Sequence, residues 1–137
     1  MAAQILIHRA VIDELLTHAR SEPSVECCGL LAGRDGIITT VFRTKNALAS
    51  ATAYEIAPME LFELFRRMRE EYLDHLGIYH SHPVGENAPS RSDIAQAHYP
   101  ETPYFIISPR PETIRSVRAF SISDGRVEEL EIVLVLA

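Results

Sequence analysis

The chain has 137 residues, 47% of them hydrophobic and 23% charged, an ordinary balance for a single globular domain, which we expect to span residues 1–137. Thirteen lysines and arginines stand against 19 aspartates and glutamates, and this net charge of −6 disfavours nucleic acid as a partner, because phosphate contacts need clustered positive charge. No apolar run is long enough to span a membrane and the first residues do not resemble a signal peptide, so we expect a cytoplasmic protein without a membrane segment.

The first third of the chain predicts two strands that pair with each other, preceded by a strand and a helix. Residues 5–7 read as a short strand, and apolar residues at three-to-four-residue spacing over 11–19 predict an amphipathic helix. The apolar run 27–33 and the segment 37–42 then flank the turn sequence Asp35-Gly36. We expect these two segments to form an antiparallel pair, because Asp-Gly suits a tight hairpin turn.

The segment 58–72 shows the clearest helical pattern in the chain. Pro58 suits the first helical position, where the missing N–H costs no hydrogen bond. Five apolar side chains fall at helical spacing, and we expect them to face the core. They are Leu61, Phe62, Phe65, Met68 and Tyr72.

The rest of the chain predicts a strand, a loop, a short helix and three more strands. Residues 76–79 form the strand, 83–89 the loop, and the helix begins near Ser90 and ends before Pro100. The three further strands are 104–108, 114–122 and 127–135. Helices interspersed among mostly antiparallel hairpins predict an α/β fold in which helices flank a mixed, largely antiparallel sheet in three layers.

Two histidines follow the predicted strand 76–79, in the sequence Tyr-His-Ser-His-Pro. Side chains two residues apart on an extended segment point to the same face, so His80 and His82 can converge on one ion. A third ligand from Asp93 would leave the fourth position of a tetrahedral zinc site to water, as in catalytic sites. Such an ion polarises a carbonyl and activates water, and the pattern therefore favours a hydrolase.

The segment around Asp93 has a second interpretation. Ser90-Arg91-Ser92-Asp93 matches a capping box, in which the serine caps a helix and the acid bonds back to the serine backbone. The cap and ligand roles of Asp93 are compatible, but one Ser90 hydroxyl cannot fully serve both a cap and an oxyanion. The candidate general base is Glu26, and its alternative is an exposed glutamate in a loop, the commoner fate of a single Glu.

Three segments together resemble the JAMM (MPN+) metalloproteases. They are Glu-Cys-Cys-Gly-Leu-Leu-Ala-Gly at 26–33, His-Ser-His-Pro at 80–83 and Pro-Ser-Arg-Ser-Asp at 89–93. Their order and spacing match the family pattern, and the resemblance covers nearly the whole chain. It implies a deaminase-like α/β sandwich.

The resemblance also implies a role for each residue of the pattern. His80, His82 and Asp93 would bind one zinc ion, and Glu26 would act as general acid and base. Ser90 would help to stabilise the oxyanion, an electrostatic contribution that is often large in acyl transfer.

The connections 44–53 and 97–103 are short, whereas deubiquitinating members of the family carry insertions there that grip a second ubiquitin. The chain is more similar to stand-alone prokaryotic members, among them peptidases that release cysteine from ubiquitin-like sulfur-carrier proteins. We therefore expect a zinc-dependent peptidase or isopeptidase that hydrolyses an amide at the C-terminal tail of a ubiquitin-like or sulfur-carrier protein.

Three alternatives are weaker. A catalytically silent MPN scaffold usually has a broken ligand set, and a RadC-type, DNA-repair-associated domain fits poorly with the acidic balance. Zinc nucleobase deaminases carry a Pro-Cys-x-x-Cys segment that is absent here.

The remaining cysteines and histidines have no obvious metal spacing. Cys27 and Cys28 are adjacent, so they cannot join distant segments, and we expect reduced thiols. Four histidines are expected at the surface or at helix ends: His8, His18, His75 and His98.

Overall fold

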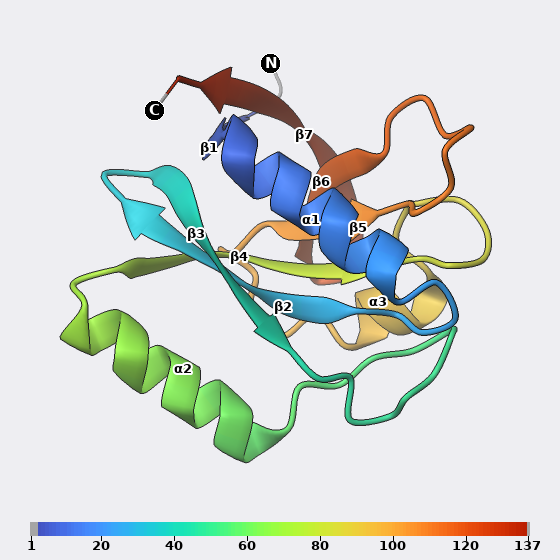
Figure 1. Cartoon of the computed structure of the whole chain (residues 1–137), viewed down its shortest axis with the longest axis horizontal. Coiled ribbons are helices and arrows are strands. Elements are labelled where there is room, and N and C mark those ends of the chain that lie inside the picture. Colours follow the sequence, from blue (N-terminus) through green and yellow to red (C-terminus); the bar gives the residue numbers. More distant parts are fainter. Residues whose placement is uncertain (1–2, 137) are drawn as a thin grey trace.

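The computed structural model describes residues 3–136 and shows helices packed on one curved sheet (Figure 1). Residues 1–2 and 137, the ends of the predicted 1–137 domain, lie outside the described residues. The elements in chain order are β1 (Gln4–His8), α1 (Arg9–Ser21), β2 (Cys28–Arg34), β3 (Ile37–Thr44), α2 (Pro58–Glu70), β4 (Asp74–Ser81), α3 (Arg91–Ala95), β5 (Tyr104–Ile107), β6 (Val117–Ser123) and β7 (Arg126–Val135). Among residues 3–136, no helix is both long and apolar enough to cross a membrane.

The strands form one mixed sheet in the order β1-β3-β2-β4-β5-β6-β7. The β2–β3, β2–β4, β5–β6 and β6–β7 pairs are antiparallel, while β1–β3, β4–β5 and β1–β7 are parallel. The mixed, largely antiparallel sheet with flanking helices is thus confirmed. The structure also shows a feature that the sandwich prediction lacked. β1 pairs with both β3 and β7, and this closes the sheet into a barrel. Accumulated strand twist makes this possible, because it brings the two outer strands of the sheet to either side of β1.

Two apolar clusters lie on the two faces of the strands, one for each long helix. Side chains alternate between the faces of a strand, so neighbouring residues enter different clusters. The cluster under α1 contains Val11, Leu15, Ala19, Leu31, Tyr79 and Phe105. The cluster under α2 contains Leu64, Met68, Leu30, Ile78, Tyr104 and Ile106. The central strands β2, β4 and β5 are therefore covered on both faces.

The prediction for α2 was right in position and partly wrong in its buried face. Leu64 and Met68 are buried, whereas the side chain of Phe62 is 60% exposed. Tyr72 is 84% exposed because the helix ends at Glu70 and Tyr72 adopts a left-handed backbone with φ 56°. Arg34 fixes this exit by donating hydrogen bonds to the carbonyl oxygens of Glu71 and Tyr72.

Both predicted hairpins form, but strand β6 of the second hairpin begins later than expected. Asp124 and Gly125 have φ 51° and 76°, the positive values that tight two-residue turns require. β6 starts at Val117, and Ile114, predicted as its first residue, is 99% exposed. The intervening loop closes through a hydrogen bond from Ser108 N–H to Ser116 O, so its residues do not extend the strand.

Candidate metal centre

β4 delivers both predicted histidine ligands to the interior. It lies between β2 and β5, with His80 opposite Cys28 on one side and Ile106 on the other. His80 is 1% exposed and His82 6%. Their Nε2 atoms lie 3.1 Å apart, so the two imidazoles converge on one point, as the i, i+2 spacing predicts.

Asp93 reaches the same point from the first turn of α3. Its Oδ1 lies 3.2 Å from His80 Nε2, and its Oδ2 lies 3.0 Å from His82 Nε2. The capping box is also present, since Ser90 N–H donates to Asp93 Oδ2 and Asp93 N–H donates to Ser90 Oγ. The cap and the contact with both imidazoles therefore coexist in one carboxylate. Ser90 Oγ acts as an acceptor in the cap, which leaves the proton of its hydroxyl available.

Glu26 completes the cluster from the segment that leads into β2. One ligand atom from each of Glu26, His80, His82 and Asp93 can be chosen so that all lie within 4.8 Å of one another. Glu26 is 4% exposed, so the alternative of an exposed loop glutamate is wrong. Its Oε1 is buried without a hydrogen-bond partner among the described residues. A buried carboxyl oxygen without a partner costs free energy, unless a bound molecule or ion interacts with it.

The charges of the cluster depend on burial and on mutual contacts. Burial raises the pKa of Glu26 to about 7, and the nearby Asp93 charge acts in the same direction. Burial lowers the pKa of His80, which favours the neutral imidazole that binds metals. Burial opposes ionisation of Asp93, but hydrogen bonds from His80 and His82 hold the pKa of this carboxyl well below its usual range.

The donor set fits a zinc ion. Two imidazole nitrogens and a carboxylate oxygen converge from fixed secondary structure, and zinc binds this combination. His82 Nδ1 lies 2.7 Å from the Glu86 carbonyl oxygen, the outer-shell contact that usually orients a histidine ligand. His80 Nδ1 is buried without such a partner among residues 3–136, and the Tyr54 ring stacks on this imidazole instead, with centroids 4.4 Å apart.

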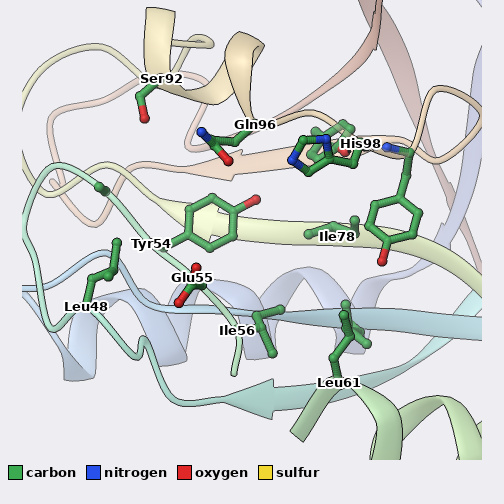
Figure 2. Close-up of a pocket in the computed structure, with 13 residues that line it drawn as sticks. Leu48, Tyr54, Glu55, Ile56, Leu61, Ile78, Ser92, Gln96 and His98 are labelled. Atoms are coloured by element: carbon green, nitrogen blue, oxygen red, sulfur yellow. Dashed lines mark hydrogen bonds between the residues drawn. The ribbon is translucent and has the colours of Figure 1, made fainter. Parts of the chain in front are cut away.

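A largely apolar cavity of about 430 Å³ is lined by Tyr54 and Ser92, among other residues. Figure 2 shows the Tyr54 ring in this cavity, with Ser92 and Gln96 on one side and Leu48 and Glu55 on the other. None of the four clustered residues lines the cavity itself, but two of its lining residues connect it to the cluster, since Tyr54 stacks on His80 and Ser92 precedes Asp93.

Sequence reasoning missed Tyr54 and the Glu86 carbonyl, both of which support a histidine. No local pattern marks Tyr54, since its contact with His80 joins a loop to a distant strand. His75 was predicted at the surface or at a helix end, and this is wrong, because it lies within β4 and is half-buried. His18 does lie at a helix end, yet it is only 2% exposed because its ring bonds to Tyr79.

The two cysteines are free, as predicted, and both are buried, which raises the pKa of Cys27 to about 11. The other two histidines also agree with the prediction, since His8 is the residue before α1 and His98 is exposed.

Comparisons with known proteins agree with this geometry. Residues 8–120 match the family described as prokaryotic homologs of the JAB domain. The CysO-cysteine peptidase of Mycobacterium tuberculosis is 33% identical over 128 residues, which are 91% of this chain and 88% of the relative. A desampylase of Haloferax volcanii is 35% identical over 104 residues, 71% of this chain and 75% of the relative.

Among solved structures, a protein of Desulfitobacterium hafniense superposes with a TM-score of 0.85 at 32% identity, covering 96% of this chain and 93% of its own. The matched family spans β2, β4 and α3, the elements that carry the cluster. The chain therefore belongs to the prokaryotic JAB-domain family, and its resemblance to the JAMM (MPN+) metalloproteases is confirmed.

Proposed function

We propose that this protein is a zinc-dependent peptidase or isopeptidase that hydrolyses an amide at the C-terminal tail of a ubiquitin-like or sulfur-carrier protein. The observation that carries the proposal is the convergence of ligand atoms from Glu26, His80, His82 and Asp93 within 4.8 Å of one another. The names of the relatives support the substrate class, since one is a CysO-cysteine peptidase and another a desampylase.

His80, His82 and Asp93 would hold one zinc ion, and Glu26 would remain outside this ligand set. A zinc ion at this place supplies Lewis-acid polarisation of the scissile carbonyl and makes water more acidic. The outer contacts already described, from Glu86 to His82 and from Tyr54 to His80, keep the two imidazoles aimed at one point. The ligands are thus arranged before any ion binds, which lowers the cost of binding.

Glu26 and Ser90 are the two side chains that act on the reacting groups without binding the metal. The Glu26 carboxylate takes a proton from the attacking water as the new C–O bond forms, and later gives this proton to the leaving amine as the C–N bond breaks. The Ser90 hydroxyl accepts a hydrogen bond in the cap and keeps its own proton, which it donates to the oxyanion.

The cavity is suited to an extended tail. Its walls are mainly apolar, with Leu48 and Tyr54 on one loop and Ser92 and Gln96 near α3. A glycine-rich tail is narrow and can bring its terminal amide to the cluster while its backbone crosses the cavity.

We further propose that residues 1–137 form one domain with the deaminase-like arrangement. The packing of α1 and α2 on separate apolar clusters, one on each face of the central strands, supports this arrangement.

The direct test follows the mass of a sulfur-carrier protein conjugated to cysteine at its C-terminus. Zinc-loaded protein is expected to release cysteine, and protein treated with a chelator is expected to release none. Protein with one bound zinc ion that leaves the conjugate intact would contradict the proposed substrate. Loss of cysteine without any bound metal would contradict the proposed chemistry.

A further inference from the structure

Asn46 lies just after β3 and is 4% exposed, and its amide uses its full hydrogen-bonding capacity. Its Nδ2 donates to Glu26 O at 3.0 Å and to Ala53 O at 2.9 Å. Its Oδ1 accepts from Leu48 N–H at 2.9 Å and from Glu55 N–H at 3.2 Å. One side chain therefore joins the start of β2 to both ends of the 46–55 loop.

The Glu26 backbone is held by this loop on both sides. Its carbonyl accepts from Asn46, and its N–H donates to Ser50 O at 2.8 Å. No side-chain hydrogen bond to the Glu26 carboxyl is present among residues 3–136, and its Oε1 is unpartnered. The position of the carboxyl therefore depends on the backbone that Asn46 and Ser50 fix.

The same loop fixes the ring that supports His80. Asn46 bonds to the peptide groups on either side of Tyr54, at Ala53 O and Glu55 N–H. The Tyr54 ring is nearly parallel to the His80 imidazole, with an interplanar angle of 21°. Because His80 Nδ1 has no hydrogen-bond partner in the described chain, this stack supports the imidazole in addition to the contacts that its Nε2 makes with Asp93 and His82.

We propose that Asn46 is a positioning residue that sets the Glu26 carboxyl and the Tyr54–His80 stack in place together. The inference rests on the proposed function for its kinetic consequence, but not for its structural one. Asn46 makes no hydrogen bond to the carboxyl of Glu26 or to the imidazole of His80, so it acts on Glu26 through the Glu26 backbone and on His80 through the loop that carries Tyr54.

Three variants test the proposal. Asn46→Ala removes all the side-chain bonds, and Asn46→Asp keeps the shape but places a carboxylate oxygen against two carbonyl oxygens. Val11→Ala is the control, since it shortens a buried side chain of α1 and loses stability by a route that does not involve the 46–55 loop.

The structural measurement needs no activity. In metal-free protein, both Asn46 variants are expected to lose hydrogen-exchange protection at the Glu26 amide relative to the amides of β5. The NMR signals of the His80 imidazole are also expected to shift, because the ring current of Tyr54 moves away. Val11→Ala is expected to change neither. Unchanged protection at Glu26 and unchanged His80 signals in a folded Asn46 variant would overturn the proposal.

The kinetic measurement compares two backgrounds in zinc-loaded protein. Asn46→Ala is expected to slow tail hydrolysis about 10- to 100-fold, since a displacement of about 1 Å can cost about 100-fold. In the Glu26→Gln background the same change is expected to cost less than in the wild-type background, because one of the two groups that Asn46 positions is already gone and only the Tyr54–His80 stack remains to be disturbed. Equal losses in both backgrounds would overturn the proposal. If wild-type protein with bound zinc cleaves no conjugate, the proposed function fails, and the exchange and NMR results still decide the role of Asn46.

Discussion

Replacing Glu26 with glutamine is expected to remove hydrolysis while it leaves the zinc ligands in place. Glutamine has nearly the same shape, but it cannot take up and release a proton. A positioned general acid or base contributes about 10²- to 10⁴-fold, or roughly 3 to 5 kcal/mol of transition-state stabilisation. The hydrolysis rate is expected to fall by this factor, and the zinc content is expected to stay at one ion, because His80, His82 and Asp93 are unchanged.

The same substitution is expected to stabilise the metal-free protein at high pH. Burial raises the pKa of Glu26 from 4.5 to about 7, and at about 1.4 kcal/mol per pKa unit this corresponds to up to about 3 kcal/mol. Glu26 ionises near pH 4.5 in the unfolded chain and near pH 7 in the folded chain, so the free energy of unfolding falls as the pH rises between these values. Above pH 7 the full cost of burying the charged carboxylate is present. Glutamine carries no charge and avoids this cost.

Urea unfolding in the presence of a chelator measures the effect. Glu26→Gln is expected to be more stable than wild type by up to about 3 kcal/mol at pH 8 and about equal to it at pH 4.5. Glu128→Gln is the matched control, because Glu128 is exposed on β7. A zinc-loaded Glu26→Gln protein with wild-type activity would refute the catalytic reasoning. A stability gain no larger than that of Glu128→Gln would refute the electrostatic reasoning.

Three further substitutions test separate contacts. Ser90→Gly keeps an acceptable helix cap but loses the hydroxyl, so we expect a free energy of unfolding within a few tenths of a kcal/mol of wild type and a hydrolysis rate about 100-fold lower. Ser90→Thr keeps the hydroxyl and is expected to hydrolyse at a rate near that of wild type. Equal rates for Ser90→Gly and wild type would show that Ser90 is a helix cap only. Tyr54→Ala is expected to weaken zinc binding about tenfold in a chelator competition, whereas Tyr54→Phe keeps the stack and the affinity. Burial lowers the pKa of His18, so the folded chain resists protonation of this imidazole and the free energy of unfolding falls as the pH drops below 6.5. Urea unfolding of His18→Gln is expected to show a smaller loss of stability with falling pH than wild type. An identical dependence of stability on pH in the two proteins would contradict this.

The half of the site that depends on local geometry could be predicted from the residues. The i, i+2 spacing places His80 and His82 on one face of an extended strand end, and the capping box places Asp93 in the first turn of α3. Glu26 could be named as a candidate base from the residues, but its approach to the histidines could not be predicted, because it depends on the pairing of β2 with β4, where Cys28 lies opposite His80. Periodicity identifies strands but does not determine which strands pair.

Other features depended on contacts that no local pattern contains. His18 is buried because its Nδ1 meets the Tyr79 hydroxyl at 2.7 Å, 61 residues away. The buried face of α2 includes Leu64 in place of Phe62, a rotation that depends on how the helix docks. The closure of the sheet depends on β1 accepting β7 as well as β3, and a pattern of five residues cannot specify two neighbours.

The two histidines are supported in different ways, and this has a consequence for the molecule as a whole. His82 is oriented by a carbonyl in its own loop, four residues away, so local geometry is sufficient. His80 is oriented by Tyr54, and the loop that carries Tyr54 also holds the backbone of Glu26. The 46–55 loop therefore links one candidate metal ligand to the candidate base. Substitutions within it should reduce hydrolysis by more than equally destabilising substitutions in β6 or β7, because those strands hold neither group.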